Sequence, residues 1–468
     1  MTATSGQHVP HAELRADFAL RLAHLYGTEV PAYNTLVEVS IAVNGDYLAA
    51  NGAEAERLGS SDRVSAERHG AIRVGSPREL AQVARVFGGF GLHPVGFYDL
   101  REAAKAVPVV STAFRPIDAV ELAKNPFRIF TSMLVHDDRR FFDDETRLRL
   151  EDFIGARRLF PEELLALADR SGKEGGLPEL DARKFLDLAT AAFELSSDPI
   201  DREWYDHLER ISSVAADIGG VPSTHINHLT PRVLNIDDLY RRLAARGLDL
   251  IDEIQGPPAW EGPDVLLRQT SFRALDETRL FKYADGTVKE ESLRVRFGEV
   301  EQRGIALTAK GRDLYDRLVA EIDRRRKDQP ARTRVEVALD VWRENLPTTE
   351  VEFAAQGLGF FTYRRGEPSG VAIETGALPH LIRSGDVIAD PIVYEDFLPR
   401  SAAGIFQSNL RGEGTRDDQE VGTPWDLVQL SEAIGIQVAD PTDLYAQQQK
   451  ASLQALSDEL GVKLQPIN

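Results

Sequence analysis

Three histidines stand out as candidates for chemistry. His225 and His228 lie three residues apart in the stretch STHINHLTPR, and His69 lies in ERHGAIRVG. The chain contains no cysteine, so any metal ion that it binds must be held by nitrogen and oxygen ligands. Imidazole is a common nitrogen ligand, but single histidines are more often ordinary structural or exposed residues. The histidines therefore indicate a metal site only in combination with a carboxylate.

A carboxylate candidate lies in the segment RVRFGEVEQRG. If this segment is a strand, its side chains alternate between two faces, and Glu299 and Glu301 share a face with Phe297. A carboxylate buried beside an aromatic ring is costly unless it is paired with a cation or bound to a metal. Arg303 lies on the same face and could pair with one glutamate, which would leave the other free for chemistry. A solvated edge strand would show the same pattern.

Two histidines and one glutamate from separate strands would suit non-haem Fe(II). Two imidazoles and one carboxylate on one face of the ion leave adjacent positions open for substrate and dioxygen. This arrangement favours a set made of His69, His225 and a glutamate of the later strand. The same ligand types also suit zinc, so a zinc enzyme is an alternative.

The surroundings of His69 and His225 share one order of elements. Each predicts a short strand, a turn, a helix that ends in glycine, and a second strand. A shift of 156 positions places His69 on His225 and Gly91 on Gly247. The shift also aligns three apolar pairs: Leu80 with Ile236, Val83 with Leu239, and Phe87 with Leu243. The pattern predicts an internal duplication, although amphipathic helices resemble one another in any case.

Composition limits the class of protein. The chain has 468 residues, of which 42% are hydrophobic and 28% charged, which predicts two or more globular units. Its formal net charge of -20 argues against nucleic acid as the main partner. We find no long apolar run and no signal-peptide pattern, so we expect no membrane association and a cytoplasmic location. No pattern indicates the oligomeric state.

Four motifs carry a resemblance over nearly the entire chain. In chain order they are ERHGAIRVG, STHINHLTPR, RFGEVEQRG and YEDFLPRSAAGIFQSNL. Together they resemble the bacterial 2-oxoadipate dioxygenase/decarboxylase family, the hydroxyglutarate synthases, formerly a domain of unknown function. That family belongs to the vicinal-oxygen-chelate superfamily.

The resemblance implies an α+β fold built on duplicated βαβββ modules that form a half-barrel metal site, with helical insertions. We expect an N-terminal helical segment, a first module, a helical insertion, a second module with the metal-binding strand, and a C-terminal region with a substrate loop. Their expected bounds are 1–60, 61–140, 141–218, 219–310 and 311–468.

The resemblance also implies a reaction and its residues. Fe(II) would be bound by His69, His225 and Glu299. Similarity to the last metal-bearing strand of 4-hydroxyphenylpyruvate dioxygenase selects Glu299 over Glu301. His228 would be a neighbour of the metal ligands. The reaction would convert 2-oxoadipate and dioxygen into D-2-hydroxyglutarate and carbon dioxide, a step of lysine catabolism. Arg73, which alternation places on the same strand face as His69, would bind the substrate as a catalytic residue.

The loop motif LPRSAAG would complete the substrate site. The resemblance implies that Ser401 contacts the substrate. Arg400 stands where the family leads us to expect a small apolar residue, and it could extend the carboxylate clamp or narrow the pocket. The preferred 2-oxo acid is therefore open. Two other classes also stay open, a His/His/Glu zinc hydrolase or isomerase and a metal-free ligand-binding protein.

Overall fold

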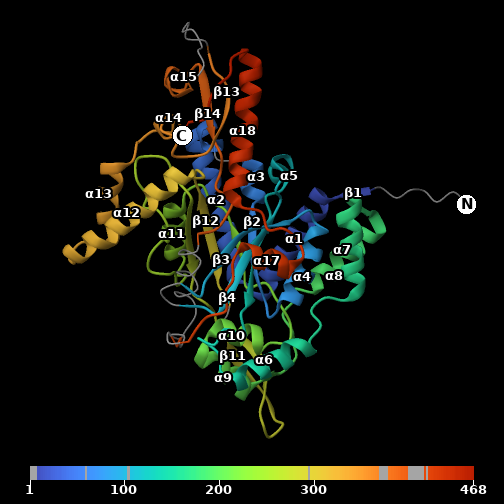
Figure 1. Ribbon diagram of the computed structural model, residues 1–468. Helices are drawn as coiled ribbons and strands as arrows, with labels where there is room; N and C mark the ends of the chain where they lie inside the picture. The colour runs from blue at the N-terminus through green and yellow to red at the C-terminus, as the bar shows by residue number, and fades with distance from the viewer. Residues whose placement is uncertain are drawn as a thin grey trace, which may run out of the picture.

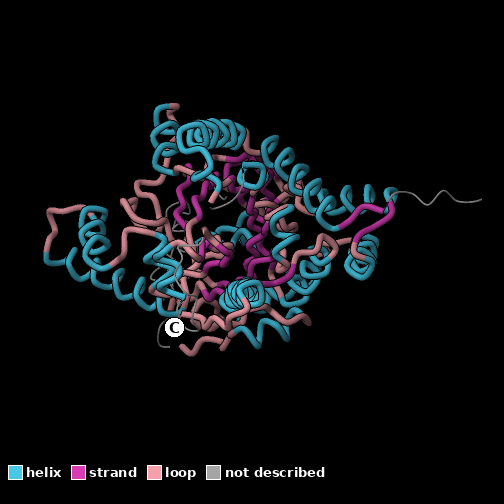
Figure 2. The backbone as a smooth tube through the Cα atoms, turned by 90° about the horizontal axis from the view of Figure 1, so that it is seen from above, coloured by secondary structure: helices cyan, strands magenta, loops and turns pink. Residues whose placement is uncertain are grey.

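The computed structural model describes residues 8–57, 61–102, 106–293, 296–367, 378–398, 416–417 and 420–467. Arg400 and Ser401 lie outside the described residues. The strands gather in the middle of the molecule and helices surround them, as Figure 2 shows. In the part of the chain that is described, no helix is long and apolar enough to cross a membrane.

The first module has the order of elements expected of it. It comprises β2 (Arg68–Val74), α4 (Pro77–Gly88), β3 (His93–Asp99), β4 (Val109–Arg115) and β5 (Arg128–Leu134). The strands lie in the order β3-β4-β5-β2, with β2 parallel to β5 and the other neighbours antiparallel. This is a βαβββ unit, and it confirms the predicted fold of the segment around His69.

The second module repeats this topology. It contains β8 (His228–Pro231), α11 (Ile236–Ala245), β9 (Leu267–Phe272) and β12 (Gly298–Arg303). Leu250 forms an antiparallel bridge with Phe272, β9 pairs antiparallel with β12, and Arg232 forms a parallel bridge with Glu301. The hairpin of β10 (Glu277–Lys282) and β11 (Val288–Leu293) is inserted before β12. β8 also pairs antiparallel with β2, which joins the two modules at their first strands.

The structure corrects the register of the duplication. Both helices begin after a capping side chain, Ser76 before α4 and Asn235 before α11, and these caps lie 159 positions apart. At the strands that precede the caps, His69 therefore corresponds to His228 and not to His225. The second helix is two residues shorter, with 10 residues against 12, and its terminal glycine follows the helix one residue sooner. Together these differences restore the 156-residue spacing between Gly91 and Gly247. A shift of three residues keeps an apolar helical face in place, so helix periodicity could not separate the two registers.

Helices frame the two modules, as Figure 1 shows. The predicted N-terminal helical segment is present as α1 (His11–Glu29) and α2 (Ala32–Asn51). The expected insertion between the modules is mainly helical: α6 (Asp144–Ala156), α7 (Glu162–Glu174), α8 (Glu179–Ala191), α9 (Arg202–Ile211) and α10 (Ser213–Gly219). After β12 come α12 (Ala309–Asp328), α13 (Arg334–Asn345), β13 (Phe361–Arg365), β14 (Val387–Pro391), α17 (Leu427–Ile434) and α18 (Pro441–Leu460). The division into domains stays a prediction.

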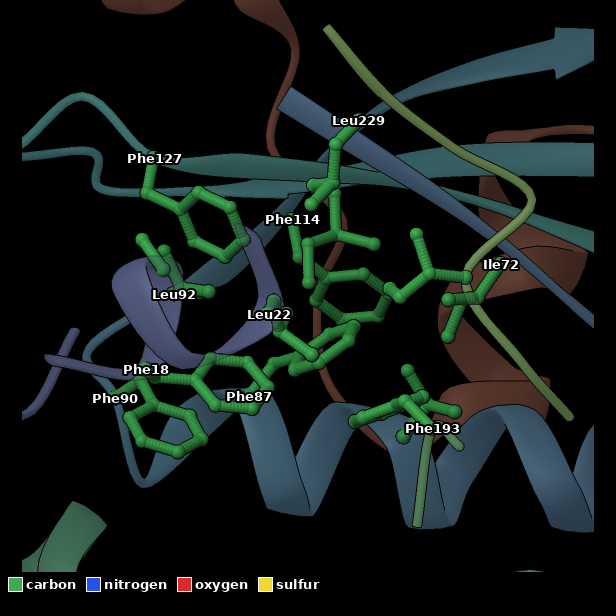
Figure 3. Packing of buried hydrophobic residues seen from close by; sticks show 14 of the residues in the cluster. Phe18, Leu22, Ile72, Phe87, Phe90, Leu92, Phe114, Phe127, Phe193 and Leu229 are labelled. Atoms are coloured by element: carbon green, nitrogen blue, oxygen red, sulfur yellow. The ribbon is translucent and has the colours of Figure 1, made fainter. Parts of the chain in front are cut away.

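An aromatic core closes one face of the central sheet. Phe87 of α4 packs against Phe114 of β4 with ring centroids 5.2 Å apart, and Figure 3 shows Ile72 and Leu229 in the same cluster. Because side chains alternate along a strand, the residues next to Ile72 and Leu229 point to the opposite face. Arg73 and His228 are such residues. The core therefore fixes one face of β2 and β8 and leaves the other face for polar chemistry.

Gly298, the residue before Glu299, allows β12 to approach β9. A Cβ atom at Gly298 would lie 1.8 Å from Cε1 of Phe272, its partner across the two strands. We expect Gly298→Ala to lower the free energy of unfolding by about 1–3 kcal/mol through overpacking. Denaturant unfolding followed by circular dichroism measures the change.

The matched control is Gly45→Ala in α2, where an added Cβ would meet nothing within 4 Å. Alanine should stabilise this exposed helical position by about 0.5–1 kcal/mol. Equal effects of the two substitutions would contradict the close approach of β9 and β12.

Candidate metal centre

Three buried side chains converge where the two modules meet. They are His69 on β2, His228 on β8 and Glu299 on β12, and one potential ligand atom from each lies within 4.8 Å of the other two. Nδ1 of His228 is 3.2 Å from Oε2 of Glu299, and Nε2 of His69 is 3.6 Å from the same oxygen. The three residues could hold a metal ion between them.

Strand pairing explains why these residues meet. In the antiparallel pair β2–β8, His228 lies opposite Ala71 and His69 lies opposite Thr230. The two histidines are therefore diagonal neighbours on one face of the pair, within reach of each other. Their rings are 5.3 Å apart at the centroids and nearly perpendicular. The parallel bridge between β8 and β12 brings Glu299 alongside them.

Neighbouring polar side chains hold Glu299 in place. Nε2 of Gln269, from β9, donates a hydrogen bond to Oε1 of Glu299. The hydroxyl of Thr230 donates to Oε2 at 3.3 Å, and the same hydroxyl lies 3.0 Å from Nδ1 of His228. The buried carboxylate is thus fixed on both oxygens before any ligand arrives.

Glu301 occupies the other side of His69. Its Oε2 lies 2.9 Å from Nδ1 of His69, and Arg303 binds both its oxygens at 2.7 and 2.8 Å. Arg128 adds a contact of 3.1 Å to Oε1. Burial alone would raise the pKa of Glu301, but Arg303 and His69 hold it well below its ordinary value. This confirms the predicted pairing of Arg303 with one glutamate. Among the described residues, Glu299 is in ion-pair range of His69 and His228 but of no arginine or lysine.

The donor set fits a metal ion. The approach of the Glu301 carboxylate to 2.9 Å from Nδ1 of His69 lacks the angle of a hydrogen bond, but it favours a ring with its hydrogen on Nδ1, which presents Nε2 to a metal ion as metal-binding histidines do. Burial lowers the pKa of His69, but Glu301 and Glu299 outweigh burial and raise it. Burial and the neighbouring His69 lower the pKa of His228 well below its usual value, so that this ring is neutral and able to act as a ligand.

The structure does not bring His225 into this group. Nε2 of His225 lies 3.2 Å from Nδ2 of Asn227 and 3.5 Å from Oδ1 of Asp217. The predicted set of His69, His225 and Glu299 is thus corrected to one with His228 as the second histidine that meets the other two. The reason is the three-residue change of register between strand and helix.

Arg73 lies on the strand face predicted for it. It is buried, with 5% of its surface exposed, and its Nη1 contacts Oδ2 of Asp217 on α10. Arg73 is two residues beyond Ala71, the residue opposite His228, and its charge adds to the effect of burial and His69 in lowering the pKa of His228. Asp217 was not a sequence candidate, because an acidic residue in a helical insertion gives no indication of its distant partner.

A buried ionic network continues from Glu301 away from the cluster. Glu67 contacts Arg128 and Arg232 at 2.8 Å each, and Arg128 also contacts Glu395. Arg303 donates to the backbone carbonyls of Tyr394 and Asp396 at 2.8 and 3.0 Å. The network therefore ties the candidate centre to residues 394–398, directly before the segment that contains Arg400 and Ser401. Glu67 was missed because the sequence does not show which of many arginines it meets.

We expect Glu301→Gln to weaken metal binding about 10- to 100-fold, since it removes the charge that supports His69. Metal and protons compete for His69, so the affinity of the unaltered chain should fall as the pH drops through the raised pKa of His69. In the variant this fall should begin at lower pH, because the pKa of His69 loses the contribution of Glu301. Chelator competition over a pH series measures both effects.

Glu290→Gln, at an exposed position of β11, is the matched control and should leave affinity and pH dependence unchanged. An unaltered pH dependence in Glu301→Gln would contradict the coupling between Glu301 and His69.

Comparison with known proteins identifies the family of the chain. A family model described as 2-oxoadipate dioxygenase/decarboxylase matches residues 18–409. A protein of Mycobacterium tuberculosis (strain H37Rv) named 2-oxoadipate dioxygenase/decarboxylase is 54% identical over 433 residues, which are 92% of this chain and 95% of that protein. A protein of the same name from Escherichia coli K12 is 39% identical over 94% of this chain and 97% of its own length.

A solved structure extends the likeness to three dimensions. The hydroxyglutarate synthase from Pseudomonas putida in complex with 2-oxoadipate superposes with a TM-score of 0.82 and 37% identity, covering 97% of this chain and 99% of that one. The chain belongs to the 2-oxoadipate dioxygenase/decarboxylase family.

Proposed function

We propose that this protein is an Fe(II)-dependent enzyme that converts 2-oxoadipate and dioxygen into D-2-hydroxyglutarate and carbon dioxide, a step of lysine catabolism. The observation that carries the proposal is the meeting of buried His69, His228 and Glu299 in a chain of this family. Relatives that carry the name of this activity match it over more than nine-tenths of their length.

His69, His228 and Glu299 are the proposed iron ligands. Three protein ligands would leave coordination positions of the ion open for a 2-oxo acid and dioxygen. Bound Fe(II) would supply the activation of dioxygen that a protein side chain cannot provide. Glu301 and Gln269 would orient the ligands, because they contact His69 and Glu299 respectively.

Arg73 is the proposed partner of the carboxylate remote from the metal. A guanidinium is suited to a carboxylate, and Arg73 projects from the same face of β2 as His69. Its burial excludes competing water, which strengthens such a contact. Ser401 and Arg400 stay predicted contributors to the substrate site.

The reaction balances without a further reductant. The bond between the first two carbons of 2-oxoadipate breaks and releases carbon dioxide. One oxygen atom of dioxygen enters the new carboxylate, and the other becomes the hydroxyl group of the five-carbon product. The substrate itself supplies the electrons, so no second 2-oxo acid is consumed.

The iron-loaded protein should consume dioxygen and 2-oxoadipate in equal amounts. With isotopically labelled dioxygen, hydroxyglutarate should carry two labelled oxygen atoms, detected by mass spectrometry, because neither atom leaves with carbon dioxide. The zinc-loaded protein should consume no dioxygen, since zinc has no redox chemistry. Turnover supported by zinc, with no uptake of dioxygen, would instead favour a hydrolase or isomerase.

His228→Ala should reduce the iron bound per chain from about one to near zero after dialysis, because it removes one of three protein ligands. Elemental analysis measures this content. His24→Ala, which alters an exposed histidine of α1, is the control and should keep its iron. Full iron content in His228→Ala would refute the proposed ligand set.

A further inference from the structure

A second buried polar cluster lies beside the histidine–glutamate group. It consists of Arg73, Asp217, His225 and Asn227, each with 5% or less of its surface exposed. Nη1 of Arg73 contacts Oδ2 of Asp217, and Nδ2 of Asn227 donates to the same oxygen at 3.0 Å. Nδ2 of Asn227 also lies 3.2 Å from Nε2 of His225. The four side chains form one connected network.

The network favours one tautomer of His225. An ionised carboxylate can only accept hydrogen bonds, so the Asn227 amide must present its nitrogen to Asp217. The second hydrogen on this nitrogen is then available to Nε2 of His225, and the 3.2 Å between these two nitrogens is shorter than the 3.5 Å between Nε2 and Oδ1 of Asp217, which favours Nε2 as an acceptor. Burial lowers the pKa of His225 despite the nearby Asp217, so the ring is neutral. A neutral imidazole that accepts at Nε2 carries its hydrogen on Nδ1.

This Nδ1–H group has no hydrogen-bond partner among the described residues, although it is buried. A buried donor without a partner carries a desolvation penalty, which a ligand with an acceptor atom can relieve. The network thus holds a neutral donor in a defined orientation, in a part of the protein that the proposed metal ligands do not use.

The position of the cluster suits the far end of the substrate. Arg73 is two residues beyond Ala71, which lies opposite the proposed ligand His228, and two residues of strand span about 7 Å. That distance is comparable to the separation of the two carboxylates in a six-carbon diacid. Ala71, on the same face between His69 and Arg73, carries only a methyl group, so no bulky or polar side chain of β2 stands between the proposed ligand His69 and the Arg73 guanidinium.

We infer that His225 is a specificity-determining residue, whose Nδ1–H donates to the terminal carboxylate of the substrate beside the Arg73 guanidinium. Asp217 and Asn227 are positioning residues: Asp217 holds Arg73, and Asn227 sets the tautomer of His225. The inference rests on the proposed function, since it takes a 2-oxo dicarboxylic acid as the substrate. The terminal carboxylate would thus accept hydrogen bonds from a charged donor, Arg73, and from a neutral donor, His225.

The test measures binding without turnover. Iron-loaded protein is titrated calorimetrically, under anaerobic conditions, with 2-oxoadipate and with 2-oxohexanoate, which has the same chain but no terminal carboxylate. His225→Ala should weaken 2-oxoadipate binding about 10- to 100-fold, as expected for the loss of a hydrogen bond to a charged group. Binding of 2-oxohexanoate and the iron content should stay within about twofold of the unaltered protein.

Two further variants make the result specific. His225→Asn places an amide N–H near the position of Nδ1 and should recover most of the affinity, whereas Arg73→Leu should abolish the preference for the dicarboxylate. His24→Asn is the surface control. Thermal unfolding identifies any variant that fails to fold, and His225→Asn then carries the test.

Three outcomes would overturn the inference. Loss of iron from both His225 variants would make His225 a metal ligand instead. Equal weakening for both acids would make its role structural, and an unchanged preference in a folded His225→Ala would exclude the contact. If the unaltered protein binds 2-oxoadipate no better than 2-oxohexanoate and consumes no dioxygen with it, the proposed function fails together with the inference. If the unaltered protein turns over 2-oxoadipate and folded His225→Ala keeps the same preference for it over 2-oxohexanoate, only the inference about His225 is refuted.

Discussion

The contact between the Glu301 carboxylate and the His69 imidazole is the interaction on which the geometry of the centre depends. Glu301 also compensates Arg303 and Arg128, two guanidinium groups that are almost fully buried. Buried charges are tolerated only when they are paired and hydrogen-bonded, so these arginines require the carboxylate where it is. Arg303 and Arg128 hold the Glu301 carboxylate in one position. His69 is oriented by that carboxylate, because its Nδ1 lies 2.9 Å from Oε2 of Glu301. The ion pairs that compensate the buried arginines therefore also orient His69 as a ligand of the candidate metal site.

The duplicated modules provide the second constraint. Each begins with a strand that carries a histidine, and the two strands pair antiparallel, so the histidines become neighbours across the junction. The last strand of the second module then lies beside the first and brings its glutamate to the same place. A site of this kind needs both modules, because neither contains two histidines and the glutamate on facing strands. The aromatic core on the opposite side of the sheet, around Phe87 and Phe114, keeps the two first strands in this relation.

Part of this arrangement could be predicted from the sequence. Strand alternation correctly placed Phe297, Glu299 and Glu301 on one face, and the nearby Arg303 explained how two adjacent glutamates could take different roles. The choice between His225 and His228 could not be made in the same way. The two helices fit one another in either of two registers one turn apart, and only the positions of their caps, Ser76 and Asn235, distinguish them. The partners Asp217, Glu67 and Glu395 come from distant segments, and spacing along the chain carries no information about which arginine each one meets.

The direct measurement of the central claim is an anomalous-scattering map of crystals grown with Fe(II) under anaerobic conditions. We expect one peak bounded by Nε2 of His69, the imidazole of His228 and the carboxylate of Glu299, with Glu301 at Nδ1 of His69 and His225 outside the coordination sphere. A peak bound by His225, or iron located away from the junction of β2, β8 and β12, would contradict this account of the protein.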